Sequence, residues 1–466
     1  MPREGRFMSE EHQNIDPDLL LRPDKPIHLV GIGGVSMRAL ARMLQDMGAA
    51  VRGSDRDESV YTRQLCETGI PVFIGHSGEN VAGAGLIIRT AAIPDSNPEI
   101  AAARAANIPV LSRAEAWGMI MKRYSRVVCV AGTHGKTSTT AMIATFTEAA
   151  ALDPTVMVGG DLRSIGGTLR IGHSDLFVAE ACEYQNSFLS FCPSVAVILN
   201  IDKDHVDFFK DTDDIILSFR KYALLTPENG LVVVNGDDEK SLRAVEGIPR
   251  RVVTFGMGEA CDIHPENVAL QDGCYRCDVI AFGKLWCCLK LSVPGKHNLV
   301  NALAAAAVAS ELGVSSEAFA KGIRAYSGVG RRFEFVKEWR GARVYDDYAH
   351  HPNEIEATLK AAKDLAPQRV ICVFQPHTYS RTVSFLKEFA EALKHADKAI
   401  LCPIYAARET NTWGISSKDI AKQIPGGEAV EDFAHAAKRL EELVRPGDMV
   451  LTMGAGNINH LASFLK

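Results

Sequence analysis

The residues with the clearest chemical meaning form a short loop, Gly132-Thr133-His134-Gly135-Lys136-Thr137-Ser138, between the apolar segment VVCVA and the helical pattern TTAMIATFTEAA. Backbone amides of a glycine-containing loop at a helix N-terminus can cradle phosphates. Lys136 would then reach the β- and γ-phosphates, and the Thr137 hydroxyl would bind Mg²⁺. The loop is shorter than GxxxxGK[ST], because position 130 is Val. We interpret it as a shortened phosphate loop.

Acidic groups follow two further apolar segments. DLFVAE ends on Glu180, and SVAVILN leads into Asp202-Lys203-Asp204-His205. Parallel sheets place ligand sites at the carboxyl ends of their strands. We therefore expect Glu180 and His205 to flank the phosphate loop and to hold Mg²⁺ together with Thr137. Solvated loops without a ligand are the alternative, and the position at strand ends disfavours it.

A second glycine turn, Gly31-Ile32-Gly33-Gly34-Val35-Ser36, follows the first apolar segment and precedes a helical pattern. Such a turn lets a backbone approach a pyrophosphate, and an acid about 20 residues later can bond a ribose. Asp55, at the end of the next predicted strand, meets that description. Ser36 stands where the dinucleotide fingerprint has its third glycine, so a nicotinamide cofactor is disfavoured. A tight turn without a ligand remains the alternative.

Amide and guanidinium side chains mark two later segments. Asn298 and Asn301, in GKHNLVN, lie three residues apart at the start of an alanine-rich helix. Both can bond a purine edge, although Asn298 can also serve as a simple N-cap. The segments GRRFE, DDYAHHP and QPHTYSRT contain Arg332 and Arg381, whose guanidinium groups suit buried phosphates and carboxylates. Separate surface arginines and loop histidines are the alternative, and they explain the three segments together poorly.

Alternating strand and helix patterns predict an α/β protein with mainly parallel sheets. A length of 466 residues suggests three domains at about 100–200 residues each, and polar segments favour the divisions 1–124, 125–328 and 329–466. The second part contains a β-rich insert, from about RVVTFG to KLSVPG. The third is predicted to open with the strand ARVYDDYA.

The composition indicates a soluble protein that neither binds nucleic acid nor inserts into a membrane. The formal net charge is -6, and no apolar run reaches the length of about 18 residues that a membrane helix needs. The N-terminal residues lack the apolar core of a signal peptide, and the 11 cysteines are typical of reduced thiols. We therefore expect a cytoplasmic location.

Four cysteines raise the question of a zinc site. Cys274, Cys277, Cys287 and Cys288 lie in two alternating segments separated by FGK. The pattern predicts a β-hairpin that uses cysteines as small apolar side chains. Neighbouring residues of a strand point to opposite faces, so Cys287 and Cys288 cannot easily bind the same ion. We expect no zinc here.

The motifs, in this order, strongly resemble those of the Mur ligase family from about Ile27 to the end of the chain. The specific marks are GIGG, GTHGKT, SFLSFCPSVAVILNIDKDH, GKHNLVNALAAAAVA, GVGRRFE, YDDYAHHPNE and FQPHTYSRT. The family implies an N-terminal Rossmann-like domain for a UDP-sugar, a central ATPase domain of the phosphate-loop type and a C-terminal Rossmann-like domain for an amino acid. The family usually has EADES where this chain has Glu180-Ala181-Cys182-Glu183-Tyr184.

The resemblance also implies residue roles. The catalytic residues would be Lys136, Glu180, His205 and Arg332, and Thr137, Glu180 and His205 would bind Mg²⁺. ATP would be bound by residues 132–138 with Asn298, Asn301, Arg332, Asp347 and Tyr348. The UDP-sugar would be bound by Gly31, Gly33, Gly34, Asp55, Thr90, Ile93, His134 and Ser187. His351, His377 and Arg381 would surround the carboxylate and the incoming amino acid.

YDDYAHHPNE and FQPHTYSRT favour the branch of the family that joins L-alanine to UDP-N-acetylmuramate. The implied reaction uses ATP to form an acyl phosphate, which the amine of alanine then attacks. The chain is expected to be a monomer or a homodimer. A murein tripeptide ligase that recycles cell-wall peptides is the near alternative. An NAD-dependent oxidoreductase and a nucleotide-binding regulator without turnover are remote ones, because neither explains GTHGKT together with Glu180 and His205.

Overall fold

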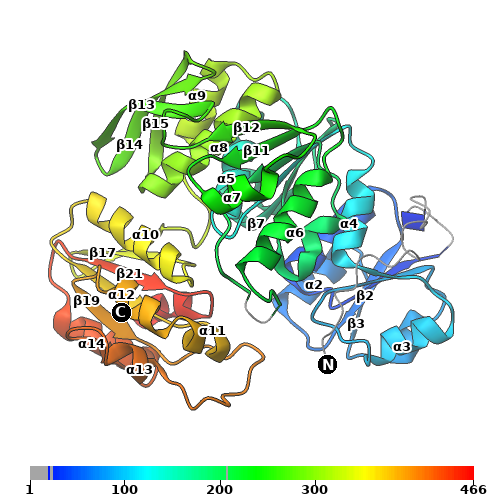
Figure 1. The fold of residues 1–466 in the computed structure, drawn as a ribbon. Coiled ribbons are helices and arrows are strands. Elements are labelled where there is room, and N and C mark those ends of the chain that lie inside the picture. The colour runs from blue at the N-terminus through cyan, green and yellow to red at the C-terminus, as the bar shows by residue number, and fades with distance from the viewer. Residues whose placement is uncertain (1–18, 21–24, 206–207) are drawn as a thin grey trace.

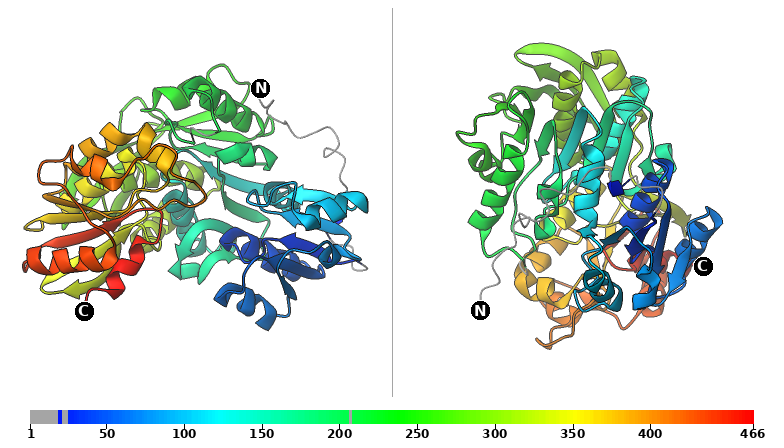
Figure 2. Two further views of the ribbon diagram at one scale, coloured as in Figure 1. Left: turned by 90° about the horizontal axis from the view of Figure 1, so that it is seen from below. Right: turned by 90° about the vertical axis from the view of Figure 1, so that its right-hand side faces the viewer.

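The computed structural model describes residues 19–20, 25–205 and 208–466. These residues form three sheets, one in each third of the chain, with helices packed on them. The N-terminal and C-terminal regions lie on opposite sides of the central region (Figures 1 and 2). The α/β class with three domains, expected from the sequence, is confirmed. Most of the N-terminal segment, for which we predict no signal peptide, lies outside the described residues.

The N-terminal region contains a five-stranded parallel sheet in the order β3-β2-β1-β4-β5. This is a Rossmann-like arrangement, in which the order reverses beside β1. The strands are β1 (Ile27–Val30), β2 (Val51–Asp55), β3 (Val72–Ile74), β4 (Leu86–Arg89) and β5 (Val110–Ser112). The helices are α1 (Val35–Asp46), α2 (Val60–Glu67), α3 (Pro98–Ala105) and α4 (Arg113–Met121).

The central region is built on a ten-stranded sheet in the order β15-β14-β13-β12-β11-β10-β6-β9-β7-β8. Its strands are β6 (Arg126–Ala131), β7 (Thr155–Leu162), β8 (Gly167–Arg170), β9 (Leu176–Glu180), β10 (Val195–Ile198), β11 (Leu231–Asn235), β12 (Arg251–Phe255), β13 (Ile263–Gln271), β14 (Cys274–Ala281) and β15 (Lys284–Pro294). The predicted β-rich insert is not a separate unit, because β12 and β13 continue the parallel sheet, and within this segment only β14 runs against its two neighbours, β13 and β15.

Helices α5 (Lys136–Ala149), α6 (Thr212–Leu224), α7 (Glu239–Val245), α8 (Lys296–Glu311) and α9 (Ser316–Ala325) pack on this sheet. Helix α8 is buried along most of its length, which explains its run of alanines: small side chains let it pack closely against its neighbours. This packing places the N-terminal part of α8 beside the N-terminus of α5, since a Cβ at Gly135 would contact the Asn301 side chain.

The C-terminal region has a six-stranded sheet in the order β16-β17-β21-β18-β19-β20. The strands are β16 (Glu334–Trp339), β17 (Ala342–Asp347), β18 (Val370–Phe374), β19 (Lys398–Leu401), β20 (Glu428–Ala429) and β21 (Met449–Met453). The principal helices are α10 (Pro352–Asp364), α11 (Tyr379–Ser384), α12 (Leu386–Leu393) and α14 (Phe433–Leu443). The prediction that β17 opens this region was wrong, because edge strand β16 precedes it. Five of its six residues are not buried, so it lacks a clear apolar alternation.

The predicted cysteine hairpin is confirmed as β14 and β15, which pair antiparallel. Cys277 and Cys287 are buried, whereas Cys288 is exposed and its thiol donates to an Asp278 carboxylate oxygen at 3.0 Å. Neighbouring cysteines of β15 therefore face opposite sides, as expected from strand geometry. None of the helices in the described parts of the chain has the length and apolar character needed to cross a membrane.

Candidate active site

The phosphate loop connects β6 to α5 and is held in an open turn by two glycines. Gly132 has a φ of +145° and Gly135 a φ of +84°, and a Cβ at Gly135 would lie 2.6 Å from Asn301 Oδ1. Asn200 holds the loop from the end of β10, since its Oδ1 accepts the His134 amide at 2.8 Å. The loop therefore keeps a defined shape at the N-terminus of α5, where backbone amides and the helix dipole favour an anion.

Lys136 belongs to a buried charge network. Its Nζ lies 3.0 Å from Glu183 Oε2, and His205 Nε2 lies 3.3 Å from Glu183 Oε1. Burial alone would lower the pKa of Lys136, but Glu183 and the neighbouring groups Cys182 and Glu180 together raise that pKa. The same attraction holds the pKa of Glu183 low against its own burial. Sequence reasoning assigned no role to Glu183, although it stands in the same short segment as Glu180.

Thr137 and Glu180 come together as predicted. Thr137 Oγ1 donates to Glu180 Oε2 at 2.8 Å, and the Gly159 amide donates to the same oxygen at 2.9 Å. A hydroxyl and a carboxylate are the oxygen donors that Mg²⁺ prefers, so this pair fits the ion that the family implies. His205 contacts Glu183 instead, and so the structure connects it to Lys136 rather than directly to this pair.

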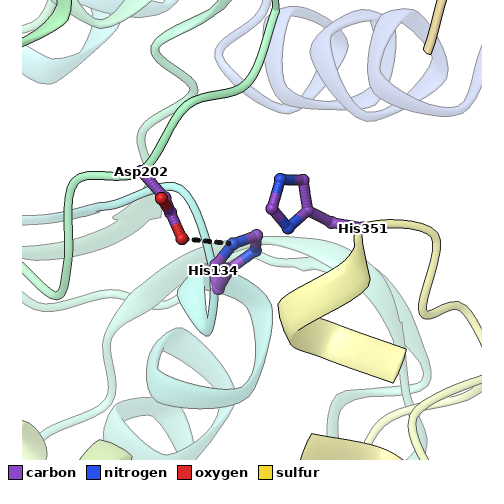
Figure 3. A group of neighbouring side chains, drawn as sticks. All are labelled: His134, Asp202 and His351. Atoms are coloured by element: carbon purple, nitrogen blue, oxygen red, sulfur yellow. Dashed lines mark ion pairs between the residues drawn. The ribbon is translucent and has the colours of Figure 1, made fainter. Parts of the chain in front are cut away.

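His134 lies where the central and C-terminal regions meet. Its Nδ1 is 3.2 Å from Glu354 Oε1, and its Nε2 is 3.8 Å from Asp202 Oδ2. His351, directly before α10, places its ring 4.7 Å from that of His134 (Figure 3). Burial would lower the pKa of His134, but Asp202 and Glu354 raise it to about 9. The loop thus carries a second cation beside Lys136 at neutral pH.

Arg381 is paired across the same interface. Its guanidinium lies 2.6 Å from Asp204 Oδ1, and both side chains are largely buried. Arg381 opposes the burial of Asp204 and keeps the pKa of this carboxylate low. His377 lies nearby in the same segment, where burial and Arg381 lower its pKa to about 4. The predicted pair His377 and Arg381 is therefore positioned against the acidic end of the β10–α6 connection.

Arg332 and the end of β17 form the next part of the site. The Arg332 guanidinium lies 5.3 Å from the centre of the Tyr348 ring and 3.9 Å from Glu354 Oε1. Asp347 accepts the backbone amides of Phe333 and Ala349, each at 2.7 Å. Burial, opposed by Arg332, raises the pKa of Asp347 to about 6. Asp347, at the end of β17, therefore holds the backbone next to Arg332 against the C-terminal sheet.

The alternative, in which Asn298 serves as a simple N-cap, is contradicted by the structure. Helix α8 begins at Lys296 with Gly295 as its N-cap. The φ of +96° at this position favours glycine. Asn298 lies inside the first turn and donates its amide to the Pro294 carbonyl at 2.7 Å. Asn301 lies 3.5 Å from the Asn298 side chain and next to Gly135. Both amides therefore lie close to the phosphate loop.

The N-terminal glycine turn gathers the residues predicted for the UDP-sugar. A Cβ at Gly31 would lie 2.8 Å from Thr90 Cγ2 and 3.6 Å from Ile93. The Gly33 amide donates to Asp55 Oδ2 at 2.8 Å, and Gly34 is the N-cap of α1. Asp55 therefore supports the turn itself, which sequence reasoning had not suggested.

Ser187 lies in a short irregular helix after Glu183. Its hydroxyl donates to the Tyr184 carbonyl at 2.8 Å, and the two preceding residues, Gln185 and Asn186, have left-handed backbone angles. The Tyr184 ring lies 4.6 Å from the His205 ring. Burial raises the pKa of neighbouring Cys182 to about 11, so its thiol is neutral. Cys182 and Tyr184 stand where the family usually has an acidic side chain and a serine.

Comparisons with known proteins agree with this geometry. Family models match the three parts of the chain: Mur ligase family, catalytic domain, at residues 26–125; Mur ligase middle domain at 130–309; and Mur ligase, glutamate ligase domain, at 331–456. A UDP-N-acetylmuramate--L-alanine ligase from Agathobacter rectalis is 47% identical over 93% of this chain and 96% of its own. One from Caldanaerobacter subterraneus is 46% identical, with 93% and 95% covered. This chain belongs to the Mur ligase family.

Solved structures show the same architecture. The crystal structure of a UDP-N-acetylmuramate-alanine ligase from Thermotoga maritima matches with a TM-score of 0.79 and 32% identity, covering 94% of this chain and 98% of that one. A murein peptide ligase from Psychrobacter arcticus matches with a TM-score of 0.70 at 23% identity, covering 95% and 98%. The second likeness concerns the fold alone.

Proposed function

We propose that this chain catalyses the ATP-dependent joining of L-alanine to the lactyl carboxylate of UDP-N-acetylmuramate, with ADP and phosphate as products. The observation that carries the proposal is the 47% identity, over 93% of the chain, to a relative of that name. The charge network around Lys136 supports it, because phosphoryl transfer needs fixed cations at the transferring group. This function places the protein in peptidoglycan precursor synthesis in the cytoplasm.

The site residues are proposed in three groups. Residues 132–138 hold the triphosphate, with Asn298, Asn301, Arg332, Asp347 and Tyr348 at the nucleotide. The sugar nucleotide is held by Gly31, Gly33, Gly34, Asp55, Thr90, Ile93, His134 and Ser187. His351, His377 and Arg381 surround the carboxylate and alanine. Two contacts support parts of this grouping: the Gly33 amide donates to Asp55, and the His351 ring lies beside that of His134 in the loop.

Thr137 and Glu180 would hold Mg²⁺, with His205 beside them through Glu183. Bound there, the ion would supply positive charge to the phosphate oxygens. Lys136 and Arg332 would neutralise charge on the transferring phosphoryl group. Glu183 holds the Lys136 ammonium at the loop in its protonated form.

The reaction proceeds in two steps. A lactyl carboxylate oxygen attacks the γ-phosphorus of ATP. The bond between this phosphorus and the leaving ADP oxygen breaks, and an acyl phosphate forms. The neutral amine of alanine then attacks the acyl carbon, the C–O bond to phosphate breaks, and the amine loses a proton. Contacts between the loop and the C-terminal region, such as that of His134 with Glu354, would exclude water from the acyl phosphate.

The boundaries 1–124, 125–328 and 329–466 are also proposed. They fall between α4, which ends at Met121, and β6, which begins at Arg126, and between α9, which ends at Ala325, and β16, which begins at Glu334. Limited proteolysis should cut at these connections before it cuts within a sheet.

The test measures ADP formation with UDP-N-acetylmuramate, ATP and one amino acid at a time. L-Alanine should be used far better than L-glutamate or a tripeptide. Glycine and L-serine should still be used weakly, since a methyl pocket gains only about 1–3 kcal/mol from a methyl group. D-Glutamate and meso-diaminopimelate should not be used. Efficient use of L-alanyl-γ-D-glutamyl-meso-diaminopimelate would instead identify a murein tripeptide ligase. Turnover independent of any amino acid would overturn the ligase proposal.

A further inference from the structure

Three side chains from distant parts of the chain form a compact group at the junction of the central and C-terminal regions (Figure 3). His134 comes from the phosphate loop, Asp202 from the connection after β10, and His351 from the residue before α10. One potential ligand atom from each lies within 4.8 Å of the other two. Two imidazoles and one carboxylate are a donor set typical of transition metals.

Each imidazole has one nitrogen already held by a neighbour. Glu354 Oε1 lies 3.2 Å from His134 Nδ1, and the Lys203 carbonyl lies 3.1 Å from His351 Nε2. A carboxylate or carbonyl on the second nitrogen is the usual support of a metal-binding histidine, because it fixes the tautomer and the ring. These contacts leave His134 Nε2 and His351 Nδ1 as the nitrogens available to an ion.

The two available nitrogens have weak partners. His134 Nε2 is buried without a hydrogen bond, and Asp202 lies 3.8 Å away. His351 Nδ1 receives only a long contact, 3.4 Å, from the Asn353 amide at the start of α10. A buried polar atom without a hydrogen bond is costly unless something satisfies it. The two nitrogens at the centre of the group therefore lack the strong partner that a bound ion would supply.

We propose that His134, Asp202 and His351 bind a divalent transition-metal ion of the Zn²⁺ or Co²⁺ class, which connects the central and C-terminal regions. Imidazole nitrogen selects such ions over Mg²⁺, which prefers oxygen ligands such as Thr137 and Glu180. Bonds of about 2.0–2.1 Å require the three donors to move closer together, which small side-chain rotations achieve. Three protein ligands leave one position open.

Binding at this site replaces a proton. The ion binds an unprotonated imidazole nitrogen, so any proton on His134 Nε2 goes to solvent, and no electron is transferred. Because His351 belongs to the C-terminal region, the ion holds that region against the phosphate loop. This connection is expected to slow opening of the site. The ion also occupies the place where His134 would meet substrate, and for both reasons we expect it to inhibit turnover. The metal binding itself does not depend on the proposed reaction.

The test titrates Co²⁺ into the full-length chain, freed of metals with chelator and kept in excess Mg²⁺. One Co²⁺ should bind per chain, with visible absorption typical of nitrogen and oxygen ligands. His351→Ala and Asp202→Asn should each weaken binding by at least about tenfold, the scale seen even for supporting residues of metal sites. Circular dichroism confirms that both variants fold.

Two control variants make the result decisive. His173→Ala, at an exposed histidine of the central region, should bind Co²⁺ as the wild type does. Thr137→Ala should also bind it unchanged, because Thr137 belongs to the proposed Mg²⁺ pair. Thiolate absorption bands would place the ion at cysteines and overturn the proposal. Equal binding by wild type and His351→Ala, or displacement of Co²⁺ by Mg²⁺, would overturn it as well.

Discussion

The chain contains two strand–glycine turn–helix units that differ in what surrounds the turn. In the N-terminal unit, between β1 and α1, one carboxylate oxygen of Asp55 accepts the Gly33 amide and no lysine stands in the turn. In the central unit, between β6 and α5, Lys136 lies against Glu183, and Thr137 donates to Glu180. Both turns present backbone amides at a helix N-terminus, which is sufficient to bind an anion.

The comparison shows that two turns with similar backbones can serve different purposes, one for binding and the other for chemistry. The N-terminal turn is fixed by neutral and carboxylate contacts that orient amides, which suits recognition of an unreactive pyrophosphate. The central turn adds a largely buried cation whose position is set by a buried acid. Charge stabilisation of a transition state needs such preorganised charges rather than amides alone. The following experiments are expected to affect turnover at the central unit, and folding stability or substrate binding at the N-terminal unit.

Replacing Lys136 by Ala should have the largest effect. Loss of a cation at the transferring phosphoryl group is typically worth several kcal/mol, so kcat should fall by about a thousandfold or more. Phosphate release at saturating substrates measures it, and Lys284→Ala, at an exposed lysine of β15, is the matched control. Activity above about a tenth of the wild-type value would remove Lys136 from the chemistry.

Replacing Glu183 by Gln should have the next largest effect on turnover. Lys136 would lose the acid that positions it and raises its pKa, and kcat should fall by about a hundredfold, or about 2.7 kcal/mol. Glu148→Gln is the control, because Glu148 also forms an ion pair with an arginine in the central region, away from the loop. A kcat unchanged from wild type would show that Lys136 needs no acidic partner.

Replacing Glu99 by Gln tests the support of the N-terminal turn. Buried Glu99 accepts from Ser54 at 2.6 Å, and the Ser54 carbonyl accepts the amides of Gly31 and Ile32. Burial opposes the ionised form, but the His28 ring 3.6 Å away and hydrogen bonds from Ser54, Asn80 and His76 lower the pKa of Glu99 from 4.5 to about 2. Its contribution, on the order of 3 kcal/mol, is therefore present above pH 4.5 and lost as pH falls toward 2.

The measurement for Glu99 is the urea midpoint at neutral pH and near pH 3, followed by circular dichroism. Glu99→Gln should unfold at lower urea than wild type at pH 7, and the two proteins should converge as the pH falls. Glu79→Gln, at an exposed residue of the same region, should match wild type throughout. A difference that stays constant with pH would show that ionisation of Glu99 does not stabilise the fold.

Replacing Gly33 by Ala should have the smallest effect and change binding alone. The new Cβ would lie 2.8 Å from Asp55 Oδ2 and 3.2 Å from Thr62 Cγ2, so the Asp55 side chain must move. The KM for UDP-N-acetylmuramate should rise about tenfold, or about 1.4 kcal/mol, while kcat and the KM for ATP stay unchanged. Ser36→Ala, in the first turn of α1, serves as the control. An equal rise in both KM values would contradict separate roles for the two turns.

Local sequence determined much of this protein. The α/β class, the two glycine turns, the strands ending at Glu180 and Asp55 and the cysteine hairpin were all predictable, because each depends on a short apolar pattern and its neighbouring turn residues. The pairing of Thr137 with Glu180 followed from one further rule, that parallel strands end at the same edge of the sheet. Strand β16 was missed since most of its side chains are not buried.

Only the tertiary structure decided the partners of the charged residues. Glu183 faces Lys136, Glu354 faces His134, and Asp204 faces Arg381. The last two pairs lie 220 and 177 residues apart, and they form only when the C-terminal region meets the phosphate loop. No local periodicity encodes such contacts, because which acid meets which base depends on how the sheets pack. The local sequence therefore determines the separate turns and strands, and packing decides which charges act together.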